Sequence, residues 1–155
     1  MAEPDAKKEL ARETGGSMLR DLKSHHNMFW DSVRDFHLEP LFKRAYADPA
    51  RKKLIQRWLA SSAGKNIIIR QLDFYCDPLL VEIRSEGWTS RVLDGGAEPL
   101  AQVELHAIHL ALISLSDTLR SFAFGMVRGQ FKLPLLFKNP RDHYYAMRIF
   151  LGGGK

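Results

Sequence analysis

The chain has 155 residues, of which 45% are hydrophobic and 26% charged. This length and composition are typical of a single globular domain with an ordinary hydrophobic core. The one cysteine, Cys76, excludes an internal disulfide and suits a reducing compartment. The net charge of +5 favours acidic partners, namely nucleic acid, anionic lipid or an acidic protein face.

The N-terminal sequence carries no recognisable targeting segment. Residues 1–16 lack the apolar core of a secretory signal, and their acidic residues argue against a transit peptide. The longest uncharged stretch within the strongest predicted helix is Leu105–Ser116, which as a helix would measure roughly 18 Å. That is well short of the ~30 Å hydrocarbon layer. We expect an intracellular protein of the cytoplasm or an organelle matrix without a transmembrane span, and peripheral membrane contact stays open.

Six of the seven prolines follow an acidic or amide residue, a pattern typical of helix starts. Proline is tolerated at the first helical position, where its missing N–H would have no partner. Asp or Asn before it accepts hydrogen bonds from the first turn, and a Glu suits the positive end of the helix dipole. The exception is Leu133-Pro134. The six pairs are Glu3-Pro4, Glu39-Pro40, Asp48-Pro49, Asp77-Pro78, Glu98-Pro99 and Asn139-Pro140.

Gly15-Gly16 separates a short charged arm, residues 1–16, from a first long predicted helix over 17–37. Residues on one side of that helix are spaced alternately three and four apart, as in an antiparallel helix-packing seam. The residues of this seam are Leu19, Leu22, His26, Phe29, Val33 and Phe36.

Shorter elements are predicted next. Glu39-Pro40 starts a helix that ends near Ala47, and Asp48-Pro49 starts another over about 49–62. The inward face of this second helix consists of Leu54, Ile55, Trp58 and Leu59.

The region between residues 67 and 96 is harder to assign. Three isoleucines in 67–75 favour a strand, whereas the surrounding pattern favours a helix. Asp77-Pro78 is interpreted as the start of a turn or two of helix that ends at Gly87. Residues 88–96 are interpreted as a loop because Asp94-Gly95-Gly96 is typical turn sequence.

The strongest pattern follows Glu98-Pro99 and predicts a second long helix over about 99–127. Its apolar residues repeat at alternating spacings of four and three, which indicates a packing seam of a central helix. Gly125 and Gly129 are expected to mark its end. The seam residues are Ala101, Leu105, Ile108, Leu112, Leu115, Leu119, Phe122 and Met126.

These patterns predict an all-α fold. We expect an irregular bundle built on two long antiparallel helices, 17–37 and 99–127, with short flanking helices. A small β-element near 67–84 is the main alternative. The whole chain, 1–155, is expected to form one helical domain, with 1–16 as an arm and 131–155 as a C-terminal extension that includes a short helix over about 140–150.

Two histidines three residues apart, His106 and His109, would share one face of the second long helix and could chelate a metal ion. A third ligand would have to come from His26 or His37 on the first helix. We favour the interpretation that these are hydrogen-bonded core histidines. A metal site, a pH sensor and a polar pair that fixes helix register are the lesser alternatives. No cofactor is predicted.

A basic cluster, which also includes Arg51, lies on the two short helices. Tyr46 and Trp58 fall among these cations, as a phosphate-binding surface requires. On a helical wheel, however, the charges scatter around the helix, so a solvated surface is favoured over an acidic protein partner, nucleic acid or lipid headgroups. The candidates for contact with an anionic partner are Lys43, Arg44, Lys52, Lys53 and Arg57.

No catalytic motif is complete. Residues 63–66 resemble the end of a phosphate-binding loop, but Leu59 occupies the position of its first glycine and Asn66 that of its Ser or Thr. The sequence contains no GxSxG, HExxH, CxxC or GxGxxG. Cys76 has no adjacent activating base and is interpreted as a small packing residue.

The apolar segment FKLPLLF, residues 131–137, cannot be an interior strand because of Pro134. It packs either on the domain's own core, which is favoured, or against another chain. The function hypothesis is a non-catalytic subunit or adaptor of a larger protein assembly. The alternatives are an RNA- or ribosome-associated protein and a metal- or histidine-dependent enzyme. Candidate partner-binding residues are Phe131, Leu133, Leu135, Leu136, Phe137, Tyr144 and Tyr145.

Overall fold

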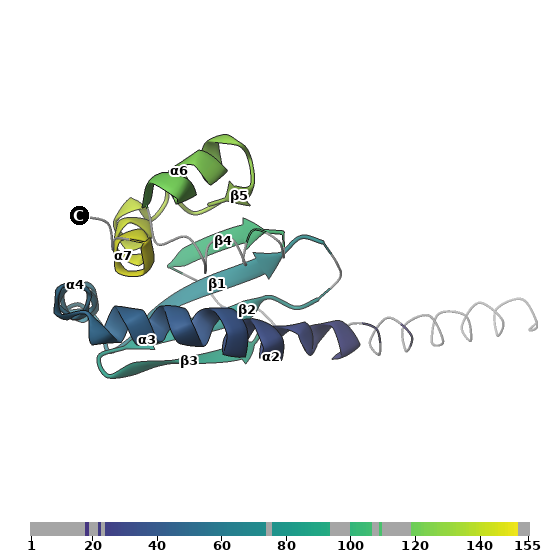
Figure 1. The fold of residues 1–155 in the computed structure, drawn as a ribbon, viewed down its shortest axis with the longest axis horizontal. Coiled ribbons are helices and arrows are strands. Elements are labelled where there is room, and N and C mark those ends of the chain that lie inside the picture. Colours follow the sequence, from purple (N-terminus) through teal and green to yellow (C-terminus); the bar gives the residue numbers. More distant parts are fainter. Residues whose placement is uncertain are drawn as a thin grey trace, which may run out of the picture.

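A computed structural model describes residues 18, 22, 24–73, 76–93, 100–106, 109 and 119–151, without the side chains of 119–122. It contains a five-stranded mixed sheet together with several helices (Figure 1). The predicted all-α fold is therefore wrong, and so is a bundle built on two long antiparallel helices.

The strand order across the sheet is β3-β2-β1-β4-β5. Only β1 and β4 run parallel, and the other neighbours are antiparallel. The strands are β1 (Lys65–Gln71), β2 (Leu79–Arg84), β3 (Gly87–Val92), β4 (Ala101–Leu105) and β5 (Phe131–Lys132).

Strands β1 and β2 lie within the segment where a β-element was the alternative. The three isoleucines of β1 favour a strand over a helix, because β-branched side chains fit the pleated surface of a sheet. The helix predicted after Asp77-Pro78 is wrong, since β2 occupies that segment. Ile67 pairs with Val81 and Ile68 with Leu80, which points the two pairs to opposite faces of the sheet.

The loop predicted over 88–96 is a strand as far as Val92, and 94–96 lie outside the described residues. β3 pairs with β2 along its full length, from Gly87↔Arg84 to Val92↔Leu79. Trp88 stacks on Phe42 with ring centroids 4.3 Å apart and planes at 9°. Pairing with β2 and the contact of Trp88 with Phe42 thus stabilise a strand in a segment whose sequence is mostly polar.

The long helix predicted over 99–127 is wrong as well. Ala101–Leu105 form β4, and helix α6 covers only Leu119–Val127. Apart from His109, residues 107–118 lie outside the described part of the chain. Ala101 and Leu105, spaced four apart, fit a helical seam and also fit one face of a strand.

The first long helix is better predicted. Residues 24–27 are helical, and α2 (Phe29–Val33), the π-helical segment η1 (Arg34–Leu38) and α3 (Glu39–Ala47) follow in one rod (Figure 1). Pro40 falls in the first turn of α3, directly after the wide turns of η1. A π-helical turn before proline places the missing N–H where the hydrogen-bond pattern already changes.

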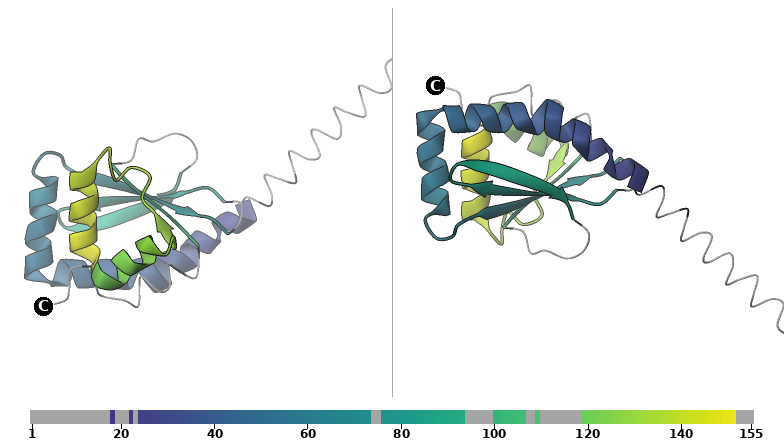
Figure 2. Two further views of the ribbon diagram at one scale, coloured as in Figure 1. Left: turned by 90° about the horizontal axis from the view of Figure 1, so that it is seen from above. Right: turned by 90° about the horizontal axis from the view of Figure 1, so that it is seen from below.

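Two further helices begin at the predicted prolines, α4 (Pro49–Leu59) and α7 (Pro140–Leu151). The Asp48 carboxylate accepts a 2.8 Å hydrogen bond from the N–H of Ala50, which caps α4. Figure 2 shows α4 and α7 side by side at one end of the sheet.

The main core lies between the sheet and the helices. A second, smaller cluster on the opposite face of the sheet contains Ile68, Leu80 and Leu93. None of the described helices is long and apolar enough to cross a bilayer. The buried residues of the main core are Trp30, Val33, Leu38, Phe42, Ala45, Ile55, Trp58, Ile69, Leu79, Val81, Ile83, Leu105, Phe131, Ile149 and Leu151.

Candidate functional site: an apolar cavity beside α7

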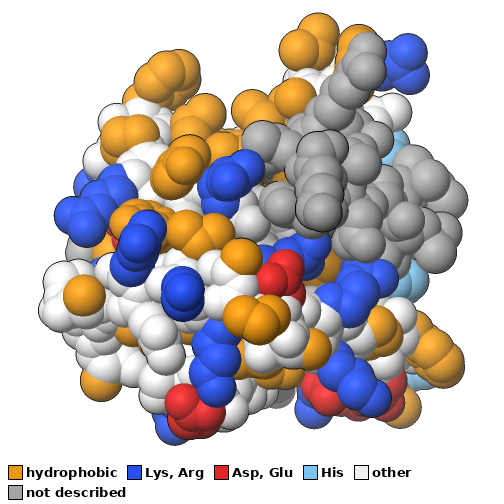
Figure 3. All heavy atoms as spheres, turned by 60° about the vertical axis from the view of Figure 1, so that its left-hand side comes forward, with side chains coloured by type: hydrophobic (Ala, Val, Ile, Leu, Met, Phe, Trp, Pro, Cys, Tyr) orange, Lys and Arg blue, Asp and Glu red, His pale blue; other side chains and the backbone are white. Residues whose placement is uncertain are grey.

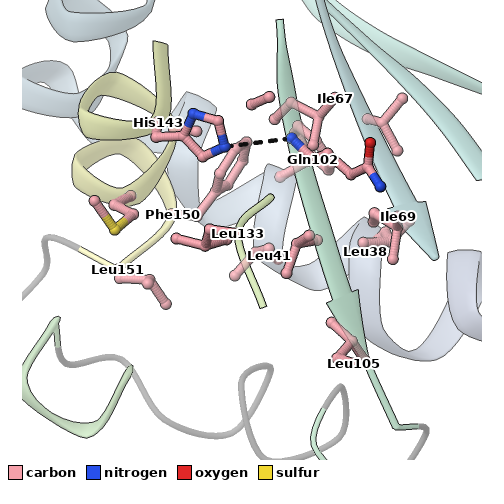
Figure 4. A pocket seen from close by; sticks show the side chains of 16 residues that line it. Leu38, Leu41, Ile67, Ile69, Gln102, Leu105, Leu133, His143, Phe150 and Leu151 are labelled. Atoms are coloured by element: carbon pink, nitrogen blue, oxygen red, sulfur yellow. Dashed lines mark hydrogen bonds between the residues drawn. The ribbon is translucent and has the colours of Figure 1, made fainter. Parts of the chain in front are cut away.

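A cavity of about 120 Å³ lies between the helix-covered face of the sheet and the helices α3 and α7 (Figure 4). Strands β1 and β4 supply one wall, and η1 with α3 supplies another. Helix α7 and Leu133, from the turn after β5, complete it. The lining residues are Leu38, Leu41, Phe42, Ile67, Ile69, Val81, Ala101, Gln102, Val103, Leu105, Leu133, His143, Ala146, Met147, Phe150 and Leu151.

The apolar character of the cavity follows from the register of β1 and β4. Ile67 is opposite Ala101 and Ile69 is opposite Val103, so these four side chains point to the same face. Ala146, one turn below Phe150 on α7, is too small to fill the space between its helix and the sheet. Every atom exposed on the wall is apolar.

His143 is the one histidine in the wall, and it is only 2% exposed. Its Nδ1–H donates to the carbonyl of Asn139 at 2.9 Å. Its Nε2 accepts the backbone N–H of Gln102 at 3.4 Å (Figure 4). The Asn139 side-chain amide also donates to the Leu100 carbonyl at 3.0 Å. The first turn of α7 is therefore fastened to the start of β4, and both imidazole nitrogens serve that contact.

Helix α7 is also fastened to α4. The indole N–H of Trp58 donates to the Asp142 carboxylate at 2.7 Å. The Tyr145 ring stacks on that of Trp58 with centroids 6.3 Å apart and planes at 7°. Polar and aromatic contacts thus fill this side of α7, whereas the other side faces the cavity.

The predicted histidine pair is close in space but lies after β4, where a central helix was expected. The rings of His106 and His109 are 5.7 Å apart, and His109 meets Phe131 at the same centroid distance. His106 contacts the carboxylate of Asp73 at the surface. Within the described ranges, no group of three or more His, Cys, Asp or Glu side chains is placed to hold a metal ion, so His26 does not complete a site there.

The predicted basic cluster is dispersed in the structure. Arg51 is buried and pairs with Asp48 at 3.3 Å, and Lys52 pairs with Glu86 at 3.2 Å. These two cations are partly neutralised within the fold. The remaining cations are exposed on α3 and α4, namely Lys43, Arg44, Lys53 and Arg57.

The predicted partner surface divides into buried and exposed parts. Phe131 is a core residue of β5, and its ring is covered by α6 at Gly125. Leu133 lines the cavity. A partner contact through Phe131 is therefore incompatible with its burial. Phe137 is 97% exposed and Tyr144 is 54% exposed. The half-buried members are Leu135, Leu136 and Tyr145.

Cys76 is half-buried beside the core. Burial raises the pKa of its thiol, the negative charge of Asp77 raises it further, and a hydrogen bond with Trp30 opposes them. A thiol with a raised pKa is a poor nucleophile at neutral pH. The interpretation of Cys76 as a packing residue agrees with this environment.

Sequence reasoning gave His143 no role and did not find the cavity. One signal was present: His143, Ala146, Met147 and Phe150 are spaced three, four and seven apart and share one face of α7. Nothing in the sequence indicated that β4 lies opposite that face.

No family model matches the chain, and no curated protein is significantly similar to it. Among solved structures, the chain is similar to one described as "UbiJ-SCP2 Ubiquinone synthesis protein". That match has 13% sequence identity and a TM-score of 0.46, and it covers 77% of this chain and 84% of the other.

Proposed function

We propose that this protein is a non-catalytic binding module that holds the apolar part of a small molecule in the cavity between α7 and the sheet. The observation that carries this proposal is the wall of the cavity, on which only apolar atoms are exposed. Apolar pockets with a few fixed polar groups at their edge are the usual form of small-molecule sites.

The volume defines what the cavity can hold. A cavity of ~150 Å³ lined by aliphatic and aromatic side chains accepts benzene. The cavity here measures about 120 Å³. It therefore suits a ring or a short stretch of hydrocarbon chain, and the remainder of a larger amphiphile would extend beyond it.

An occupant would also stabilise the fold. A hydrocarbon group that fills the space recovers dispersion contacts with its walls. Binding should therefore raise the free energy of unfolding by RT ln(1 + [L]/Kd), where [L] is the free ligand concentration.

The polar groups of the wall support binding over chemistry. His143 and Gln102 are paired with each other through the backbone N–H of Gln102. General acid–base catalysis needs a side chain within reach of the reacting proton. Both nitrogens of His143 are engaged by the protein itself.

The test is a titration with decanoate, an amphiphile with a plain hydrocarbon chain, followed by calorimetry. In the Ala146→Leu variant the added carbons occupy the cavity while helix propensity is kept, since both residues are good helix formers. We expect affinity to fall at least about tenfold. Each methylene of the ligand excluded from the apolar site costs ~0.8 kcal/mol, and the three added carbons of leucine should exclude at least about two, which exceeds the ~1.4 kcal/mol of a tenfold change.

The matched control is Ala47→Leu, which adds the same carbons at an exposed position near the end of α3. Its affinity should equal that of the wild type. Equal affinity in all three proteins, or no saturable binding by the wild type, contradicts the proposal.

A second candidate is the assembly subunit predicted from the sequence. Exposed Tyr144 favours it, because tyrosine is enriched at the centre of protein interfaces. Gentle purification from the native source, followed by sizing, tests this candidate. A monomer that carries no other protein counts against it, and so does a Tyr144→Ser variant that co-purifies with the same partners.

A further inference from the structure

Three large apolar side chains are exposed on neighbouring elements near the C-terminus. Phe124 and Val127 on α6 are 55% and 87% exposed, and Phe137 in the turn before α7 is 97% exposed. Helix α6 packs on β5 and α7, so these elements form one connected part of the surface. A folded protein gains nothing from leaving such side chains in water, and their grouping indicates a contact surface.

The segment from residue 123 to residue 141 itself carries only positive charges, and Glu104 on β4 lies opposite Lys132. Between residues 123 and 141 the chain carries four cationic side chains and no acidic one. Each of the four is exposed. The next acidic residue, Asp142, is hydrogen-bonded to Trp58. The docking surface is defined by Phe124, Val127 and Phe137 together with Arg128, Lys138 and Arg141. Lys132 is not part of it, because Phe131 points toward α6 and the next residue of the strand points to the opposite face of the sheet. Figure 3 shows hydrophobic and basic side chains gathered together on the upper part of one face of the molecule, with few acidic ones among them.

This combination matches an anionic bilayer. At a membrane interface, apolar side chains enter the headgroup layer while cations contact the acidic lipid headgroups around them. The centre of a protein interface is instead depleted in lysine. A single-stranded nucleic acid would require aromatic faces for stacking along a basic groove. The docking surface has two exposed rings, Phe124 on α6 and Phe137 in the turn, and two rings on separate elements do not supply such a series.

We propose that the docking surface binds this protein to an anionic lipid bilayer. The position of Leu133 adds a link to the cavity, because Leu133 lines the cavity wall and Phe137 follows it within the same turn. The turn therefore lies between the cavity and the lipid that the surface would contact. The proposal depends on surface residues alone and does not require the cavity to be occupied.

The test uses the full chain and flotation with phosphatidylcholine vesicles prepared with and without phosphatidylglycerol. The wild type should float with the vesicles that contain phosphatidylglycerol and remain behind with neutral ones. Raising the salt concentration should release it, because exposed charges are screened.

Two variants remove the apolar and the electrostatic contribution to membrane binding separately. Phe137→Ser should weaken partitioning about tenfold, since the phenyl ring no longer leaves water. Lys138→Glu should weaken it by at least about fivefold, the contribution of one cation near an anionic surface. Both positions are exposed, so the fold should tolerate the changes.

Matched controls place the same changes elsewhere. Phe36→Ser alters an exposed phenylalanine on η1, and Arg91→Glu reverses an exposed charge on β3, at the opposite edge of the sheet from β5. Both should float like the wild type, and so should Ala146→Leu. The proposal is overturned by failure to float with either vesicle, by equal flotation with neutral vesicles, or by controls that lose binding as strongly as Phe137→Ser. Capture of a protein through Phe137 without any vesicle binding would assign the surface to that protein instead.

Discussion

Helix α7 is held differently on its two sides. Toward α4, the Trp58–Asp142 hydrogen bond of 2.7 Å and the Trp58–Tyr145 ring contact leave little space. Toward β4, its first turn is tied through Asn139 and His143, and beyond that turn the helix borders the cavity.

The difference separates stability from binding within one helix. Packing on α4 fixes where α7 lies, so the side that borders the sheet does not need to be filled for the fold to form. An apolar cavity can then persist beside a well-anchored helix and accept an occupant. Substitutions on the two sides should accordingly have different consequences.

The largest loss of stability is expected for substitutions on the side of α7 that packs against α4. Trp58→Ala removes an indole that is 2% exposed, and such changes cost about 3–5 kcal/mol in the free energy of unfolding. Urea unfolding followed by circular dichroism measures the loss. Trp58→Phe retains a ring but leaves Asp142 without its donor, so it should cost less. If Trp58→Ala were as stable as the wild type, α4 would not be the anchor of α7.

The next effect concerns α6, which packs against α7 and β5. A Cβ at position 125 would lie 2.0 Å from the ring carbon Cε2 of Phe131. Gly125→Ala should therefore destabilise the protein by about 1–3 kcal/mol through overpacking. Gly87→Ala is the control, because an added Cβ there meets nothing within 4 Å. Equal urea midpoints for the two variants would refute the close approach of α6 to β5.

A smaller effect is expected where α7 meets the sheet. His143→Leu removes the acceptor of the Gln102 N–H and leaves that donor unpaired, which costs about 1–2 kcal/mol. The loss should remain below that of Trp58→Ala. A larger loss would mean that β4, and not α4, is the principal anchor of α7. Amide hydrogen exchange at Gln102 should become faster in the same variant.

The smallest change in stability is expected at Tyr46, whose hydrogen bond does not involve α7. The Tyr46 hydroxyl donates to the Arg84 carbonyl at 2.6 Å. Burial raises the pKa of Tyr46 from 10.0 to about 12, with the Arg84 hydrogen bond opposing and the charge of Glu86 adding. Because the folded pKa is raised, the stabilisation is complete below pH 10 and is lost as the pH rises toward 12.

The pH dependence is measured as the difference between the wild type and Tyr46→Phe. The urea midpoint of the wild type should fall more steeply than that of the variant between pH 10 and pH 12. Parallel curves over that range would show that Tyr46 does not contribute.

The helical part of the fold was predictable because its signals are local. Asp48 and Asn139 stand directly before the prolines that begin α4 and α7. The same kind of pair, Asp77-Pro78, precedes a strand, because proline marks the start of an element without fixing its type. The type of β2 was decided by β1 and β3, whose pairing depends on residues distant in sequence.

A β-element near 67–84 was only the alternative to helix, and the sequence of β2 gives a further physical reason. β2 is apolar on both faces at its start, so neither a two-residue nor a helical period stands out. The cavity was missed because its walls come from separate elements. Among its lining residues, Leu133 was the one candidate site residue, and it was named as a possible partner contact. Phe137 is exposed, although packing of its segment on the domain's own core was favoured, and the partner contacts predicted for Phe137 and Tyr144 stay predictions.

The central claim is that the cavity binds hydrocarbon, and methyl NMR during a titration with decanoate tests it most directly. Saturable chemical-shift changes are predicted at the cavity methyl groups of Ile69, Leu133 and Leu151. Ile68 and Leu80 belong to the cluster on the opposite face of the sheet and should not change. An absence of saturable changes at the cavity methyl groups, or equal changes at Ile68 and Leu80, would contradict the account.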